Sequence, residues 1–324
     1  MIPAQVASLL NAHIAAVDRR VGDGPYVNES MEVRAAVIGA RTMWDHLELR
    51  QTATPLNHLS GKPQVLLAAS SPMHGEVVLK VYGRRRPHEA AVQTWWRQHG
   101  VSTVPVLAYG DHPVSWLLMT RVQRLNTEQN DALQLTRDLA SVMAQAHAAP
   151  RRPALPDFTL AHGVARHLRV VSQIATEHGY SIPDGCFDIA EQLYRSGLPV
   201  TLHGDLASAN LLQGNDGRIC VIDTCGYLGP PEFDAARWCA RIGGSRNAES
   251  LLDLWIEAAP AAPGPSTGAR PALDRVLARR LLGAELVMEA GVREIVKVER
   301  SQSWVTGDPD TSDRVELGCE LMCR

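Results

Sequence analysis

The chain has 324 residues, more than the roughly 250 to 300 at which a single hydrophobic core stops growing, which excludes a small module. With 45% hydrophobic and 21% charged residues, the composition is that of an ordinary globular protein and excludes a disordered or fibrous one. The formal net charge of −3 lacks the basic excess of a general nucleic-acid binder, so we expect no nucleic-acid partner.

The N-terminus carries no recognisable targeting signal. Residues 1–20 lack a basic start, and their apolar residues recur at helical spacing, which predicts an amphipathic helix. No apolar run approaches the roughly 18 residues that cross a bilayer. We therefore expect a cytoplasmic protein without a membrane partner, and its six cysteines are expected to be reduced thiols and not zinc ligands.

The N-terminal part of the chain mixes helical and strand patterns. Helical spacing predicts helices over residues 1–20 and 29–46. Short apolar runs bounded by turn residues then predict an antiparallel sheet. Its strands are expected at 47–56, 64–69, 76–82, 104–109 and 115–122, with a helix at 84–100 between the third strand and the fourth.

Helical periodicity dominates the rest of the chain. Helices are expected at 128–149, 158–178, 189–196 and 273–298, interrupted by extended pieces within 197–212 and 218–223 and by a Pro- and Gly-rich loop at 258–271. Strands followed by helices predict an α+β protein of two lobes. We expect an N-lobe of helices and antiparallel sheet over residues 1–121 and a helical C-lobe over 122–324.

The most specific pattern is His203-Gly204-Asp205 with Asn210 five residues after the aspartate, followed by a short apolar strand that ends at Asp223. One carboxylate can take or orient the proton of a hydroxyl group, and an amide with a second carboxylate supplies the hard oxygen ligands that Mg²⁺ prefers. The pattern predicts Asp205 as the catalytic residue and Asn210 and Asp223 as metal ligands.

Lysine is rare in this chain, which contains only Lys62, Lys80 and Lys297. Lys80 falls in the middle of an apolar strand, where a buried ammonium group needs a partner such as Glu89. The alternative is a strand lysine whose charged end reaches solvent.

These motifs resemble the aminoglycoside phosphotransferase and choline kinase family, small-molecule kinases with a protein-kinase-like fold. The segment 77–81 is similar to the strand of the phosphate-binding lysine, and Glu89 matches the helix glutamate that pairs with it. Residues 138–150 look like the helix before the catalytic loop. Within the family, 42–64 and 88–96 are most similar to the streptomycin and hydroxyurea phosphotransferases.

The resemblance implies ATP as cofactor, with GTP as an alternative, together with Mg²⁺. It also implies a set of residues around the nucleotide: Lys80 and Glu89 at the phosphates, Ser60 and Gly61 in the loop that covers them, and Met119, Thr120 and Val122 beside the adenine. It assigns structural support of the catalytic loop to Asp234, and we expect His203 to bond the backbone of the loop and not to act as a base. Glu232 and Trp238 are the candidates for contact with the acceptor.

The chain departs from protein kinases in two places. No GxGxxG motif accompanies Ser60 and Gly61, and Thr224 follows Asp223 where a protein kinase has DFG. The short interval between Asp223 and Pro230 leaves no room for an activation segment, so a protein substrate is not expected.

We therefore predict transfer of the γ-phosphoryl group of ATP to a hydroxyl of a small molecule, namely an aminoglycoside or another cationic antibiotic, which the modification would inactivate. Residues 281–320 hold nine acidic and four basic residues, a bias that suits a polycationic drug, although solvated acidic helix faces explain it equally well.

Three alternatives remain open. A metabolic kinase for choline, homoserine, a sugar or a fructosamine would use the same machinery with a different acceptor pocket. A pseudokinase regulator would bind ATP without turnover. A metal-dependent hydrolase is disfavoured, because the chain has no HExxH, GxSxG or GxxxxGK[ST] motif.

Overall fold

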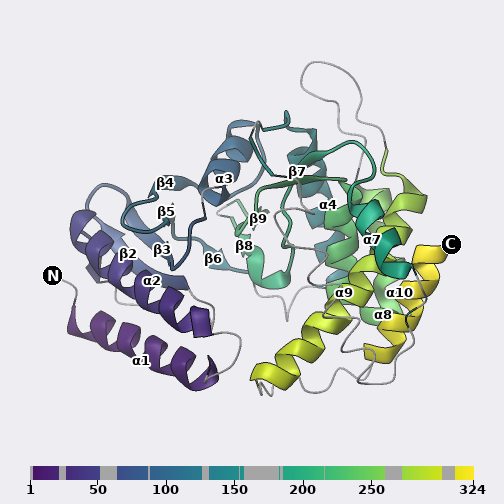
Figure 1. Ribbon diagram of the computed structural model, residues 1–324. Coiled ribbons are helices and arrows are strands. Elements are labelled where there is room, and N and C mark those ends of the chain that lie inside the picture. The colour runs from purple at the N-terminus through teal and green to yellow at the C-terminus, as the bar shows by residue number, and fades with distance from the viewer. Residues whose placement is uncertain are drawn as a thin grey trace. The chain divides into compact units, whose positions relative to one another are not determined.

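The structure is a computed structural model that describes residues 3–21, 27–51, 64–86, 88–125, 131–152, 154–156, 182, 185–214, 216–259, 272–300 and 311–324 (Figure 1). The chain divides into two compact units. The first contains Met1–Thr94 and Val104–Gln123, and the second contains Trp95–Thr103 and Arg124–Arg324. Each unit is described by itself.

The first unit is built on an antiparallel sheet. Its strands are β1 (Arg50–Gln51), β2 (Gln64–Ser71), β3 (Gly75–Tyr82), β4 (Val106–Gly110) and β5 (Trp116–Thr120), in the order β1-β2-β3-β5-β4. The register pairs Lys80 with Leu66 on β2 and with Leu117 on β5, which makes β3 a central strand. The predicted antiparallel arrangement is confirmed.

Helices α1 (Ala4–Val21) and α2 (Val27–His46) precede the sheet, and α2 packs against β2 and β3 (Figure 1). The core of this unit joins apolar residues of both helices to alternate positions of the strands, among them Leu10, Val37, Trp44, Val65 and Leu79. Because side chains alternate between the two faces of a sheet, these strand positions share the face that the helices cover, whereas Lys80 and Tyr82 are buried on the opposite face.

Two predicted boundaries in this unit differ from the structure. Helix α3 spans Glu89–Gln98, so it begins five residues after the predicted start at Arg84. The backbone N–H of Arg86 donates to Ser115 Oγ at 2.9 Å and so makes no hydrogen bond within a helix. Arg86 also precedes a proline in the sequence, and a proline disfavours helical backbone geometry in the residue before it. Within the predicted strand 47–56, β1 begins at Arg50 and residues 47–49 lie outside it, whereas residues 52–56 belong to the segment 52–63 that the structure does not describe.

Helices dominate the described part of the second unit. They are α4 (Ala132–Ala148), α7 (Cys186–Tyr194), α8 (Glu232–Ala258), α9 (Arg275–Arg300) and α10 (Thr311–Cys323). Helix α8 packs against α4 and α9, and α9 packs against α10. Helix α10 was not predicted from the sequence, and the predicted helix 158–178 lies outside the described residues.

Two short hairpin-like pairs carry the loops of the site. Strand β7 (Val200–Leu202) pairs antiparallel with β10 (Tyr227–Gly229), and β8 (Leu211–Gln213) pairs with β9 (Ile219–Val221). A 3-10 turn, η1 (Ser208–Asn210), precedes β8. Strand β6 (Gln123–Arg124) is the other neighbour of β8 in this sheet. These pairings hold the ends of residues 203–210 and 222–226 in defined positions. Within the described residues, no helix is long and apolar enough to span a membrane.

Candidate active site

The loop that follows β7 contains the His203-Gly204-Asp205 motif. Gly204 has a φ of 78°, in the left-handed region that favours glycine. A Cβ atom at this position would lie 2.9 Å from the Tyr227 ring and 3.1 Å from Cys225 Cβ. The loop can therefore pass close to β10 only because residue 204 has no side chain.

Asp234 holds the loop from the first turn of α8. Its carboxylate accepts hydrogen bonds from the backbone N–H of His203 at 2.9 Å and of Gly204 at 3.0 Å, and from His147 Nε2 at 2.9 Å. Burial alone would raise the pKa of Asp234, but the hydrogen bond and charge of His147, together with His203 and the Gly204 amide, hold that pKa below its usual value. Asp234 is a buried, ionised anchor for the motif.

His203 joins the two halves of the site through its ring. The Asp205 N–H donates to Nδ1 at 3.3 Å, and Nε2 lies 2.8 Å from the Ile222 carbonyl. A carbonyl can only accept, so Nε2 carries the proton and Nδ1 is the acceptor. Burial lowers the pKa of His203, in agreement with this neutral form. The ring fixes the loop of Asp205 to the segment that precedes Asp223.

Asn210 and Asp223 are brought together by the β8–β9 pair. Leu211 pairs with Val221, and the Ile222 N–H donates to the Asn210 carbonyl at 3.0 Å, which places Asp223 one residue beyond this contact. The Asn210 side chain donates from Nδ2 to the Asp205 carbonyl at 2.7 Å, so its amide oxygen is the atom suited to a cation.

The backbone at Asp223 is itself unusual. Its φ of 62° is rare for a residue with a side chain, although less so for aspartate, and such conformations cluster at functional sites. No group of three or more His, Cys, Asp or Glu residues that could hold a metal ion occurs in the part of the chain that the structure describes. An Asn–Asp oxygen pair nevertheless fits Mg²⁺, which is commonly held by one or two protein groups and substrate phosphates.

In the first unit, Lys80 and Glu89 form a buried ion pair. Lys80 Nζ lies 2.8 Å from Glu89 Oε1, and the two side chains are 1% and 5% exposed. The Tyr82 hydroxyl donates to the other oxygen of Glu89, and Lys80 Nζ lies 5.0 Å from the centre of the Tyr82 ring. Tyr82 was missed by the sequence analysis, although it lies two residues after Lys80 and therefore on the same face of β3.

The remaining predicted nucleotide residues are placed only in part. Ser60 and Gly61 lie outside the described residues. Met119 and Thr120 end β5, where Met119 is buried and pairs with Val78, and Val122 follows half-buried.

Both predicted acceptor residues have structural contacts. Trp238 is fully buried and donates from Nε1 to Thr136 Oγ1 at 2.9 Å, which links α8 to α4. Glu232 is buried and accepts from the Asp274 N–H at 3.0 Å, next to the start of α9. Their contact with the acceptor stays a prediction.

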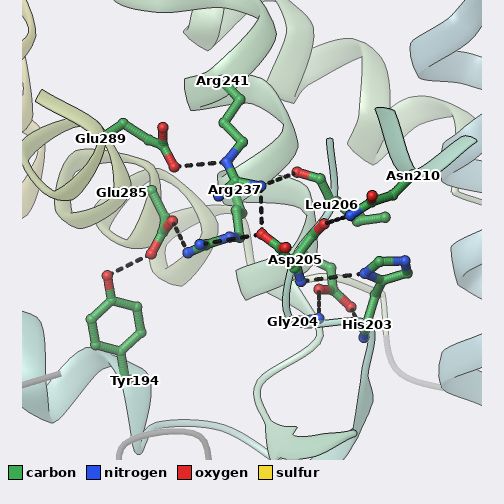
Figure 2. Close-up of polar contacts among 11 residues, drawn as sticks. Tyr194, His203, Gly204, Asp205, Leu206, Asn210, Arg237, Arg241, Glu285 and Glu289 are labelled. Atoms are coloured by element: carbon green, nitrogen blue, oxygen red, sulfur yellow. Dashed lines mark hydrogen bonds and ion pairs between the residues drawn. The ribbon is translucent and has the colours of Figure 1, made fainter. Parts of the chain in front are cut away.

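A charged network around Asp205 was not predicted (Figure 2). Arg241 Nη1 lies 2.8 Å from Asp205 Oδ1, and Arg237 Nη2 lies 3.7 Å from the same oxygen. Each arginine, one turn apart on α8, also pairs with a glutamate one turn apart on α9: Arg237 with Glu285 at 2.9 Å and Arg241 with Glu289 at 2.7 Å.

The inner half of this network is deeply buried. The Tyr194 hydroxyl donates to Glu285 Oε1 at 2.6 Å. Burial raises the pKa of Glu285 and that of Tyr194 above their usual values. Burial acts to lower the pKa of Arg237, but the carboxylates of Glu285 and Asp205 outweigh it and raise that pKa. Two of the nine acidic residues in 281–320, Glu285 and Glu289, therefore form ion pairs with arginines of the chain. This weakens the argument that the acidic bias serves a polycationic ligand.

Comparisons with known proteins identify the family and the fold. The model of the phosphotransferase enzyme family APH matches residues 55–270. No curated protein matches the chain. Among solved structures, the AMP-bound spectinomycin phosphotransferase APH(9)-Ia has a TM-score of 0.56 at 14% identity and covers 86% of this chain and 97% of its own.

Choline kinase LicA from Streptococcus pneumoniae has a TM-score of 0.53 at 10% identity, over 87% of this chain and 98% of its own. The aminoglycoside phosphotransferase APH(4)-Ia, in complex with ADP and hygromycin B, has a TM-score of 0.53 at 12% identity, over 87% and 97% of the two chains. At these identities the likeness shows the fold, and it confirms the predicted kinase-like fold with a sheet-based N-terminal region and a mostly helical C-terminal region. Because the family model spans two thirds of the sequence, the chain belongs to the phosphotransferase enzyme family.

Proposed function

We propose that the protein transfers the γ-phosphoryl group of ATP to a hydroxyl group of a small molecule. The observation that carries this proposal is the arrangement of Asp205, Asn210 and Asp223 on two loops joined by His203 and anchored by Asp234. A carboxylate next to an oxygen-donor pair is the set that phosphoryl transfer uses for the acceptor hydroxyl and the metal. The membership of the phosphotransferase family supports the same reaction.

In the proposed reaction, Asp205 orients the acceptor hydroxyl and takes its proton as the new oxygen–phosphorus bond forms. The bond between the γ-phosphorus and its bridging oxygen breaks, and ADP leaves. Lys80, held by Glu89 and Tyr82, binds the phosphates, and the chain at Met119, Thr120 and Val122 takes the adenine. His203 is neutral and engaged at both ring nitrogens, so it positions the loop and moves no proton.

Asn210 and Asp223 are the residues that would hold Mg²⁺, through the amide oxygen and the carboxylate. When bound, the ion would neutralise the charge that the phosphate oxygens carry during transfer. Asn210 uses Nδ2 to donate to the Asp205 carbonyl, which leaves its amide oxygen as the atom for the ion. Most of the acceleration then comes from positioning and charge neutralisation, since phosphoryl transfer needs little covalent help.

For the acceptor we propose an antibiotic, because the proteins of similar fold include a spectinomycin phosphotransferase and an aminoglycoside phosphotransferase in complex with hygromycin B. A metabolite with a hydroxyl group is the second candidate, because choline kinase LicA has a comparable TM-score. A pseudokinase would bind nucleotide without any acceptor-dependent turnover.

The test is ADP release from Mg-ATP across a panel of aminoglycosides, spectinomycin, other cationic antibiotics, hydroxyurea, choline, homoserine, fructosamines and sugars. We expect acceptor-dependent release with one class, and a loss of at least about a hundredfold in Asp205→Asn. ATP binding without release on any acceptor would favour the pseudokinase. Full activity of Asp205→Asn would exclude the proposed role of Asp205.

A further inference from the structure

One guanidinium group reaches both the side chain and the backbone of the catalytic loop. Arg241 Nη1 donates to Asp205 Oδ1 at 2.8 Å and to the Leu206 carbonyl at 2.9 Å. Its Nε donates to Glu289 Oε1 at 2.7 Å (Figure 2). A glutamate on α9 therefore fixes the arginine that bonds Asp205. All of these partners belong to the second unit.

The burial of these groups makes the contact more than a surface ion pair. The side chains of Arg241 and Glu289 are 19% and 9% exposed, and that of Asp205 is 30% exposed. Exposed ion pairs contribute little to the free energy that holds two side chains together, because solvent screens the charges and both long side chains must be ordered. Here the glutamate has already ordered the arginine, so holding Asp205 costs little further entropy.

Asp205 needs such a contact because its own segment is irregular. Residues 203–207 lie between β7 and η1, outside any helix or strand. Arg241 and Glu289, in contrast, project from α8 and α9, which pack closely against each other. A catalytic group on a loop is held within a fraction of an ångström only by residues on rigid elements.

The neighbouring arginine plays a lesser part at this carboxylate. Arg237 Nη2 is 3.7 Å from Asp205 Oδ1, beyond hydrogen-bond distance, whereas its Nη1 is 2.9 Å from Glu285. Arg237 therefore places a positive charge near the Asp205 carboxylate, whereas Arg241 donates a hydrogen bond to it.

We propose that Arg241 is a positioning residue for the reaction: held by Glu289, it fixes the carboxylate of Asp205 in the orientation that receives the acceptor hydroxyl. The inference rests on the proposed phosphotransferase function and adds two residues to it. Because its directed hydrogen bonds go to the Asp205 carboxylate and the Leu206 carbonyl, we assign it a role exerted through Asp205.

The experiment compares Arg241→Gln, Arg241→Lys and Glu289→Gln in the full chain, with the acceptor that supports turnover of the unmodified protein. Loss of a charge-assisted hydrogen bond corresponds to about a 10- to 100-fold change, so we expect kcat of Arg241→Gln to fall by that factor. KM for ATP should stay within about twofold, because Arg241 is not assigned to the nucleotide. Arg241→Lys should recover part of kcat, and Glu289→Gln should lower it by less than Arg241→Gln.

Arg279→Gln is the matched control. Arg279 Nη2 lies 2.9 Å from Asp253 Oδ1, an ion pair that also joins α9 to α8 but does not involve Asp205, so its loss should leave kcat unchanged. In an Asp205→Asn background, Arg241→Gln should cause little further loss of the residual activity, because the carboxylate through which Arg241 acts is already absent.

Several results would overturn the inference. They are a kcat of Arg241→Gln close to that of the unmodified protein, a loss that adds in full to that of Asp205→Asn, or an equal loss in Arg279→Gln. If Arg241→Gln does not fold, Arg241→Lys decides, since an unchanged kcat there would contradict a need for the forked contact. Absence of acceptor-dependent ADP release from the unmodified protein would instead contradict the proposed function.

Discussion

At the residue scale, the buried ring of His203 makes the free energy of unfolding depend on pH. Burial lowers the pKa of His203 in the folded protein, whereas in the unfolded chain the ring takes up a proton near its ordinary pKa of about 6.5. The unfolded state therefore binds more protons as the pH falls, and the free energy of unfolding must decrease below about pH 6.5.

We expect this decrease to be steeper in the unmodified protein than in His203→Gln. The measurement is the urea midpoint at several pH values between about 7 and 5. His74→Gln controls for the loss of a histidine as such, because His74 lies exposed in the turn between β2 and β3. Equal slopes for the unmodified protein and His203→Gln would contradict the prediction.

Asp234 gives a second prediction at this scale. Its carboxylate accepts from three N–H donors in a fully buried position, and an asparagine there would present an N–H₂ group to at least one of them. We expect Asp234→Asn to lower the free energy of unfolding by about 2 to 3 kcal/mol in urea denaturation. Asp253→Asn, at a half-exposed ion pair, should cost less than about 1 kcal/mol, and a similar cost for both variants would refute the anchoring role.

The site was predictable where its residues follow one another in the chain. His203, Asp205 and Asn210 lie within eight residues, and Asp223 closely follows the next apolar segment, so spacing alone pointed to one site. Arg241 and Glu289 are separated by 48 residues, and their relation exists only after α8 packs on α9. A weaker signal was present, because Arg237 and Arg241 share an i, i+4 spacing in an apolar helix, as do Glu285 and Glu289.

At the scale of elements, two glycines allow α9 and α10 to approach each other. A Cβ on Gly283 would lie 2.5 Å from the Gly318 carbonyl oxygen, and a Cβ on Gly318 would lie 2.7 Å from the Gly283 carbonyl oxygen. Backbone atoms on both sides cannot move aside as a flexible side chain could. The crossing therefore requires glycine at both positions.

We expect Gly283→Ala to destabilise the protein by about 1 to 3 kcal/mol. The sign is informative, because alanine in the middle of a helix normally stabilises it by about 1 kcal/mol relative to glycine. Urea unfolding monitored by circular dichroism measures the difference. A variant at least as stable as the unmodified protein would show that the helices do not cross as closely as described.

The same crossing explains why α10 was not predicted. Gly318 weakens the helical propensity of residues 311–323. The buried positions Val315, Cys319 and Met322 follow helical spacing, but the alternation of apolar with polar or Gly residues over 315–321 resembles a strand pattern and obscures it. What stabilises α10 is its contact with α9, which the sequence does not reveal. Strands β2, β3 and β5, in contrast, carry continuous apolar runs bounded by turns, and these were predicted.

At the scale of the whole molecule, the order of strands before helices was enough to predict the α+β class, because each class of element keeps its own periodicity. The substrate does not follow from that order. Related folds act on spectinomycin and on choline, as the names of the similar structures state, so the acceptor depends on side chains that differ between members.

The last prediction tests nucleotide binding separately from catalysis. A ligand that binds only the folded state stabilises it, by about 2.7 kcal/mol at a concentration of a hundred times its dissociation constant. Mg-ATP should therefore raise the melting temperature of the unmodified protein. Asp205→Asn should keep this shift, because its proposed role is toward the acceptor, whereas Lys80→Met should lose most of it.

The comparison must use the shift on adding Mg-ATP and not the melting temperature alone. Lys80→Met removes one partner of a buried ion pair and leaves the carboxylate of Glu89 with the Tyr82 hydroxyl, which lowers stability by itself. Arg85→Gln, at an exposed arginine close to the same strand in sequence, controls for a general loss of positive charge. If Lys80→Met kept the full shift while Asp205→Asn lost it, the roles of the two residues would have to be exchanged, with Asp205 serving the nucleotide and Lys80 serving only the stability of β3.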